Sequence, residues 1–158
     1  RLLRGLEKRP AWRKRRHEPL AGLLRFQRRP GLAVSRAFER RAFGGLLISR
    51  IKLVEGDELN TLDLVEPRDP AYAERALGRA IESSLRDRPI HVLTAEDFVL
   101  FKLLSTRDRD LADAESVTRS LGADLQRELV ELELPSLAGA SPEHDIPARW
   151  RRVLAGQT

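Results

Sequence analysis

Two neighbouring stretches in the middle of the chain have the hydrophobic pattern of paired β-strands. Residues 46–54, LLISRIKLV, and residues 59–65, LNTLDLV, are rich in Leu, Ile and Val, and a polar turn, EGDE, lies between them. This pattern predicts an antiparallel hairpin. Because side chains alternate between the two faces of a strand, Asp63 faces away from the side of Leu62 and Leu64. We therefore expect a hairpin that carries one carboxylate in the middle of its second strand.

Helical spacing of apolar residues accounts for most of the remaining chain. Asp69 and Pro70 are typical of a helix start, and the apolar stripe that follows predicts a helix through Leu85. Other helices are predicted for residues 31–43, ending at Gly44 and Gly45, for Thr94 to Ser105, for Asp110 to Gly122, and for the segments ADLQRELVELELP and IPARWRRVLAG.

A short strand, IHVL at residues 90–93, completes the predicted elements. Their order is a helix, two strands, a helix, a strand and then helices alone. This order indicates an α+β domain over residues 31–158, with helices packed on a small mixed sheet and a helical C-terminal end.

Lys102 lies in unusual surroundings within the helix predicted to begin at Thr94. Its neighbours are almost all apolar: Phe98, Val99, Leu100, Phe101, Leu103 and Leu104. An unpaired buried charge costs several kcal/mol, so a lysine here requires an anion. The segment RDRD follows, and Asp108, Asp110 or Asp113 could return beside Lys102. One interpretation is an ion pair that fixes the corner between two helices; the other is a lysine that faces a cleft and binds a substrate phosphate.

Charge divides the chain into two parts. Residues 1–45 hold 14 Lys and Arg against 3 acidic residues, whereas residues 46–158 hold 15 against 21. The run Arg13, Lys14, Arg15 and Arg16 could contact nucleic acid, because such residues neutralise phosphates and release counterions. The competing interpretations are a disordered or poorly packed basic segment over residues 1–30, and translation from an arginine-rich wrong reading frame.

Deleting residues 1–30 is expected to leave the midpoint of thermal unfolding nearly unchanged. Three prolines and a dense positive charge oppose a packed core in this segment. Thermal unfolding of the deleted and full chains measures the effect, and a large drop in the midpoint would show that the segment docks on the domain.

The composition of the chain excludes some kinds of site and indicates where the protein is located. The chain has no cysteine, which excludes disulfides and thiolate metal sites, and its three histidines lie far apart in sequence. No apolar run approaches the roughly 20 residues that cross a membrane. We expect a cytoplasmic domain that makes no membrane contact. Because the sequence begins with Arg1 and contains no methionine, we also expect a fragment of a longer protein.

Residues 46–125 resemble part of the bacterial nucleotidyltransferase-like proteins, a group that includes minimal nucleotidyltransferases and abortive-infection toxins. The resemblance rests on the strand LNTLDLV, the helix after it, the strand IHVL and the segment TAEDFVLFKLLSTRDRDLAD. Its most specific part is the spacing from Glu96 and Asp97 to Lys102, together with Asp110 and Asp113.

The resemblance implies nucleotide transfer from a nucleoside triphosphate, with three carboxylates that hold two Mg²⁺ ions. Asp63 matches the third carboxylate and is the candidate catalytic and metal-binding residue. The alternative is a strand carboxylate that pairs with Arg50 or Lys52 across the hairpin and needs no metal. In the family the other two follow a Gly-Ser turn in an Asp-x-Asp strand, whereas here the first aspartate of the chain is Asp57. The resemblance therefore implies a truncated or degenerate domain, inactive as this chain and without a tightly bound metal.

Two other functions are consistent with the sequence. One is a non-catalytic interaction module, whose acidic helical part binds a partner protein, such as the other member of a toxin–antitoxin pair, while the basic N-terminal segment contacts nucleic acid. The other is a purely nucleic-acid-binding protein, which rests on the basic segment alone and lacks a helix-turn-helix motif.

Overall fold

The computed structural model describes residues 31–156. Residues 1–30, with the predicted basic segment and the run from Arg13 to Arg16, lie outside the described residues, as do residues 157 and 158.

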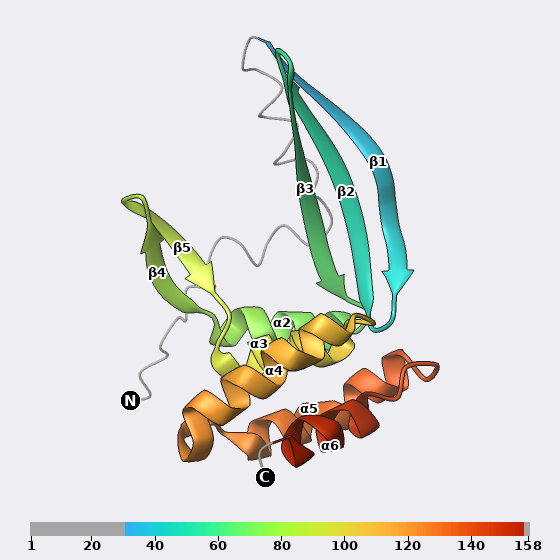
Figure 1. The fold of residues 1–158 in the computed structure, drawn as a ribbon, viewed down its shortest axis with the longest axis vertical. Coiled ribbons are helices and arrows are strands. Elements are labelled where there is room, and N and C mark those ends of the chain that lie inside the picture. The colour runs from blue at the N-terminus through green and yellow to red at the C-terminus, as the bar shows by residue number, and fades with distance from the viewer. Residues whose placement is uncertain (1–30, 157–158) are drawn as a thin grey trace, which may run out of the picture. The chain divides into compact units, whose positions relative to one another are not determined.

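The described residues form an α+β fold, which confirms the predicted class (Figure 1). The strands form two small antiparallel sheets, one with the order β1-β2-β3 and one made of β4 and β5. The elements in chain order are β1 (Leu32–Phe43), β2 (Leu46–Glu55), β3 (Glu58–Pro67), α2 (Pro70–Arg79), β4 (Ile81–Leu85), β5 (Arg88–Val92), α3 (Ala95–Leu104), α4 (Asp108–Leu121), the 3-10 helix η3 (Gly122–Asp124), α5 (Arg127–Ala140) and α6 (Ile146–Ala155).

Two compact units make up the described chain. One contains residues 31–37 and 51–62, which include the turn between β2 and β3, where Gly56 has a φ of 59°. The other contains residues 38–50 and 63–156 and holds all the helices. The predicted hairpin over residues 46–65 is confirmed, because β2 and β3 are neighbours in the sheet and the predicted turn joins them.

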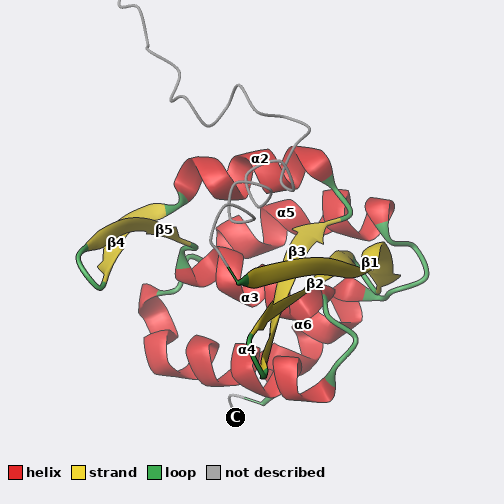
Figure 2. Ribbon diagram, turned by 90° about the horizontal axis from the view of Figure 1, so that it is seen from above, coloured by secondary structure: helices red, strands yellow, loops and turns green. Residues whose placement is uncertain are grey.

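Helix α3 lies at the centre of the helical unit and contacts α4, α5 and α6 (Figure 2). Its residues Val99, Leu100, Leu103 and Leu104 are buried, and they pack with Leu111, Val130, Leu137, Ile146, Trp150 and Val153 of the other three helices. A helix that is apolar on nearly every side is expected where neighbours cover it on several sides. This central position explains why residues 95–104 show no clearly polar face.

The helix predicted for residues 31–43 is wrong, because these residues form strand β1. Leu32 and Val34 are partly buried while Ala33 and Ser35 are exposed, which is the alternation of a strand. Helix-favouring residues such as Ala37, Glu39 and Arg41 do not decide the outcome, since pairing with β2 overrides local propensity.

The helix after Asp69 is also shorter than predicted. Asp69 caps α2 as expected, accepting hydrogen bonds from the amides of Ala71 and Tyr72, but the helix ends at Arg79. After Ala80, residues Ile81–Leu85 form β4, which pairs with β5. Strand β5 includes Ile90, His91 and Val92 of the predicted strand IHVL. Arg86 and Asp87 both have positive φ angles, 50° and 59°, as a two-residue hairpin turn requires.

Helix α4 begins at Asp108, two residues earlier than predicted. The N-cap residue is Arg107, which makes no side-chain cap hydrogen bond, and the carboxylates of Asp110 and Asp113 both bind Lys102. The predicted end of the helix at Gly122 is confirmed, and this residue has a φ of 55°.

Gly44 and Gly45 form the turn between β1 and β2, where the sequence predicted a helix end. Gly44 has a φ of 58°, and a Cβ atom there would lie 2.7 Å from the carbonyl oxygen of Leu104 at the end of α3. Gly45 donates its amide hydrogen to the same carbonyl at 2.9 Å. The turn thus contacts the last residue of α3 without room for a side chain at Gly44.

We expect Gly44→Ala to lower the free energy of unfolding by about 2 kcal/mol. The change forces an alanine into the left-handed backbone conformation and brings its Cβ atom into a clash with the carbonyl oxygen of Leu104. Urea denaturation measures the loss. Gly139→Ala in α5 is the control: a Cβ atom at Gly139 meets nothing within 4 Å, so this change should be neutral or slightly stabilising. Equal losses in the two variants would contradict the steric explanation.

Candidate functional site

Lys102 lies at the corner between α3 and α4 and is held by two carboxylates. The Thr94 side chain accepts a hydrogen bond from the Asp97 amide at 3.2 Å and begins α3, as predicted. Lys102 Nζ donates to Asp110 Oδ1 and Asp113 Oδ2, each at 2.7 Å. The structure therefore contains the ion pair that the sequence analysis expected at this corner.

Asp110 is the most heavily paired member of this corner. Its second oxygen accepts hydrogen bonds from the Ser105 hydroxyl and from Arg107 Nε. Burial alone would raise the pKa of Asp110, but the hydrogen bonds from Lys102, Ser105 and Arg107 outweigh it and lower the pKa to about 2. Burial would likewise lower the pKa of Lys102, but the hydrogen bonds to Asp110 and Asp113 raise it.

Asp108 has a different environment from the other two predicted acids. It occupies the first position of α4, and its charge acts on Arg149 of α6. Burial lowers the pKa of Arg149, and the negative charge of Asp108 opposes this shift. The structure thus brings Lys102, Asp110 and Asp113 together and places Asp108 toward α6.

Asp63 lies on β3 opposite Arg50 of β2. Arg50 Nε and Nη2 donate to the two carboxylate oxygens of Asp63, each at 2.7 Å, in the bidentate fork that arginine and carboxylate favour. These hydrogen bonds lower the pKa of Asp63, with a smaller contribution from the charge of Arg107. Arg107 also donates to Asp110, so its charge acts on both Asp63 and Asp110.

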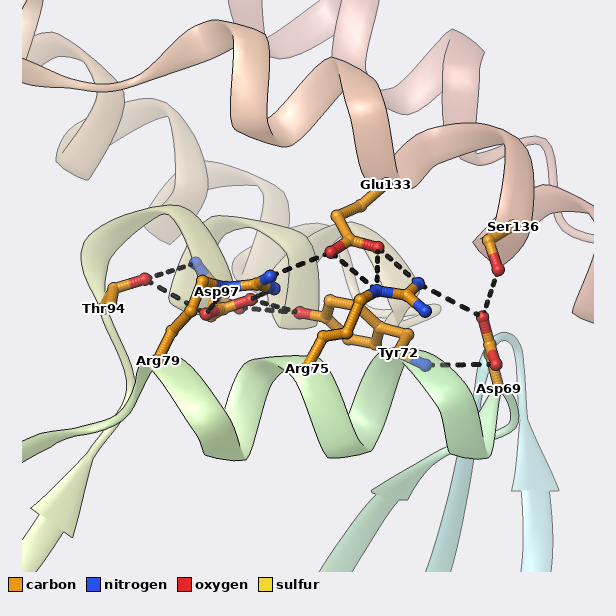
Figure 3. A network of polar contacts seen from close by, with 8 residues as sticks. All are labelled: Asp69, Tyr72, Arg75, Arg79, Thr94, Asp97, Glu133 and Ser136. Carbon is orange, nitrogen blue, oxygen red and sulfur yellow. Dashed lines mark hydrogen bonds and ion pairs between the residues drawn. The ribbon is translucent and has the colours of Figure 1, made fainter. Parts of the chain in front are cut away.

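A buried ionic network on α2, α3 and α5 was not anticipated from the sequence (Figure 3). Its centre is Asp97, whose side chain is 0% exposed. Arg79 donates to it through Nη2 at 2.7 Å and Nε at 2.9 Å, and the Tyr72 and Thr94 hydroxyls lie at 3.2 Å. Burial and the nearby Asp97 charge raise the pKa of Tyr72, so the phenol stays protonated and donates.

Glu133 of α5 joins the same network from the opposite side. It accepts hydrogen bonds from Arg75 and Arg79, at 2.6 Å and 3.0 Å respectively for the shortest contacts. Burial would raise the pKa of Glu133, but the two arginines outweigh it and lower the pKa. Ser136 donates to Asp69, the cap of α2, and so ties the start of that helix to α5. The network joins three helices through charge rather than through apolar contact.

One sequence signal could have indicated this network. Arg75 and Arg79 are four residues apart, which places both on one side of α2. Glu133 lies three residues after Val130 and four before Leu137, both buried, so helical spacing places it on the buried side of α5. A carboxylate at such a position requires a cationic partner.

The described residues do not offer a ready-made metal site. Residues 31–156 contain no group of three or more His, Asp or Glu side chains placed to hold a metal ion. In the same part of the chain, no helix combines the length and the apolar character needed to span a bilayer.

Comparison with protein-family models found no match, and comparisons with curated proteins and with solved structures also found none. The geometry of Asp63 and of the Lys102 corner is therefore the main structural indication of function.

Proposed function

We propose that residues 31–158 form a nucleotidyltransferase-like domain that does not transfer nucleotides on its own. The observation that supports this proposal is the fork between Arg50 and Asp63, in which both oxygens of the candidate metal ligand are engaged at 2.7 Å. A guanidinium cation already neutralises the only carboxylate that matches the metal-binding pattern of the family.

The chemistry of the implied Mg²⁺ ions explains why this observation matters. Mg²⁺ requires nearly octahedral oxygen coordination, and a two-metal site needs several rigid carboxylates. Asp63 has Arg50 beside it in place of further acids, and an ion at this position would have to displace the guanidinium. The donor set around Asp63 therefore does not fit the two ions.

Lys102 has a structural role in this proposal. Its ammonium group faces Asp110 and Asp113, so little positive charge remains for a substrate phosphate. The resemblance in residues 94–113 then reflects a shared helix corner that positions strands and helices.

The purified chain is expected to transfer no label from nucleoside triphosphates to itself, to RNA or to a co-expressed neighbouring protein, with Mg²⁺ present. Grafting a Gly-Ser turn and an Asp-x-Asp strand from an active relative should create activity, and Asp63→Asn should abolish it. Robust transfer by the unmodified chain would overturn the proposal, and activity of the grafted protein that survives Asp63→Asn would overturn the role of Asp63.

A paired substitution tests Asp63 without any activity assay. In Arg50→Met, Mg²⁺ should shift the Asp63 amide signal in NMR spectra at lower concentrations than in the wild type, because the competing cation is gone. Arg40→Met is the matched control, since it releases Glu66 on the same strand from a 2.6 Å ion pair. Identical Mg²⁺ responses near Asp63 in both variants would show that Asp63 is an ordinary surface carboxylate.

A second candidate function is a protein-interaction module. Large apolar side chains are exposed on α2 and on the β4–β5 hairpin, with Leu77 at 50% and Ile81 at 55% exposure. Native mass spectrometry of the chain co-expressed with the product of a neighbouring gene tests for a toxin–antitoxin type of complex. The nucleic-acid contact through residues 1–30 stays a prediction.

A further inference from the structure

The β4–β5 hairpin has one apolar face that the rest of the helical unit leaves exposed. The strands pair Ile81 with Val92, Ser83 with Ile90 and Leu85 with Arg88, so these residues share one face. Ile81, Leu85 and Val92 are 55%, 61% and 39% exposed. Figures 1 and 2 both show the hairpin projecting away from the helices.

This arrangement is unfavourable for a hairpin by itself. A two-stranded hairpin is marginally stable in water and normally needs further strands or a packed face. Exposed apolar side chains at adjacent positions are typical of interaction surfaces. The hairpin has two outer edges, one on β4 and one on β5.

The turn geometry distinguishes the two edges. In a hairpin with a two-residue turn the flanking residues, Leu85 and Arg88, form a hydrogen-bonded pair, and the bonded pairs then alternate along the ladder. The pair of Ser84 with Pro89 therefore directs its backbone groups outward. Pro89 has no N–H, which weakens the outer edge of β5, a common protection of edge strands. On β4, Glu82 and Ser84 present both donors and acceptors.

We propose that β4 pairs antiparallel with β4 of a second copy of this chain, about a two-fold axis at Ser83. In this register Glu82 faces Ser84 of the second copy, and the outward N–H and C=O groups of the two residues form hydrogen bonds with each other. The two-fold axis repeats this pair, because Ser84 likewise faces Glu82 of the second copy. The product is a four-stranded sheet with the order β5-β4-β4-β5. The edges of this sheet are the two β5 strands that Pro89 protects.

Side-chain chemistry favours the same register. Glu82 lies diagonally across from Arg86, the first turn residue, of the second copy, which gives two opposite-charge pairs across the axis against the single like-charge pair of the two Glu82 residues. On the other face Ile81 lies opposite Leu85 of the second copy and extends the apolar row that begins at Val92. The pairing thus has more opposite-charge than like-charge contacts across the axis, and it places apolar residues opposite apolar residues.

A disulfide test is direct because the natural chain contains no cysteine. Ser83→Cys places the two sulfur atoms at a non-hydrogen-bonded pair on the axis, where the Cα atoms lie about 4.5 Å apart and a disulfide can form. We expect rapid disulfide-linked dimers from the full chain under mild oxidation. Ser84→Cys, its neighbour on the opposite face and off the axis, should react slowly. Equal rates would overturn the register.

Sedimentation of the unmodified chain over a range of concentrations tests the dimer itself. Ser84→Pro removes an outward N–H from β4 and should yield a monomer, whereas His91→Pro removes one from the outer edge of β5 and should leave the dimer intact. Glu82→Arg should weaken the dimer about tenfold, and Glu82→Arg with Arg86→Glu should restore it. Circular dichroism confirms that each variant is folded. A monomeric wild type, or a dimer that survives Ser84→Pro, would overturn the proposal.

Discussion

Asp97→Ala is expected to lower the free energy of unfolding by about 3–5 kcal/mol, the typical cost of removing one partner from a buried ion pair. The Asp97 side chain is 0% exposed and accepts hydrogen bonds from Arg79, Tyr72 and Thr94. Its loss leaves the Tyr72 hydroxyl without its acceptor side chain and leaves Arg79 with Glu133 alone as an ionic partner.

Urea denaturation of Asp97→Ala and of further variants separates charge from packing. Asp97→Asn keeps the shape and should also destabilise strongly, because a neutral amide cannot balance Arg79. Glu131→Ala, on the exposed side of α5, is the control and should change the free energy by less than about 0.5 kcal/mol. In a double-mutant cycle with Arg79→Met the losses should be less than additive. A loss below 1 kcal/mol in Asp97→Ala would contradict a stabilising role for the network.

The elements that the sequence predicted correctly have strong local signals. The hairpin over residues 46–65 combines two β-rich runs with a glycine turn, and its strand carboxylate Asp63 has an arginine partner across the ladder. Helix α3 begins at a Thr cap, and α4 ends at a glycine with positive φ. In each case the residues that decide the structure lie within a few positions of one another.

The two missed strands lack such local signals. Residues 31–43 contain Ala, Arg, Glu and Phe at spacings compatible with a helix, and only pairing with β2 makes them a strand. Residues 81–85 continue the apolar stripe of α2, and the deciding feature is the turn at Arg86 and Asp87, where two non-glycine residues adopt positive φ. Two-residue hairpin turns are most often recognised in a sequence by glycine or asparagine. Arg86 and Asp87 include neither residue, so this turn was not predicted.

Local patterns place Arg75 and Arg79 on one side of α2 and Glu133 on the buried side of α5, but they do not show that these side chains meet, because the partners come from different helices. Arg75 and Glu133 are 58 positions apart in the sequence. Only the packing of α2 against α5 brings them together, and solvated pairs at similar spacings are common on helix surfaces. The sequence therefore identified the Lys102 corner, whose partners lie within 11 residues, and missed the larger cluster.

A common feature links the carboxylates of the candidate site with those of the network. Asp63 faces Arg50, Asp97 faces Arg79, Glu133 faces Arg75, and Asp110 faces both Lys102 and Arg107. Each of these acids is held by a cation of the chain itself. This pairing supports the proposal that Asp63 does not hold metal ions on its own.

The Lys102 corner is expected to weaken sharply in acid. The pKa of Asp110 is about 2 in the folded state against an ordinary value of 3.8, so the folded state binds this proton less readily than the unfolded state does. The contribution of Asp110 is therefore complete above about pH 4 and is lost as the pH falls toward 2. A difference of this size corresponds to about 2 kcal/mol of stability.

Urea denaturation at several pH values between 2 and 7 measures this contribution in the wild type and in Asp110→Asn. We expect Asp110→Asn to lose about 2–4 kcal/mol at pH 7, because Lys102 keeps only the more exposed Asp113, and to show a flatter decline below pH 4. Lys102→Ala should cost more than Lys102→Met, since the methionine stem still packs beside Phe98 while both changes leave Asp110 without the ammonium group. Equal losses in the two Lys102 variants, together with parallel pH profiles for wild type and Asp110→Asn, would show that the ion pair does not stabilise the corner.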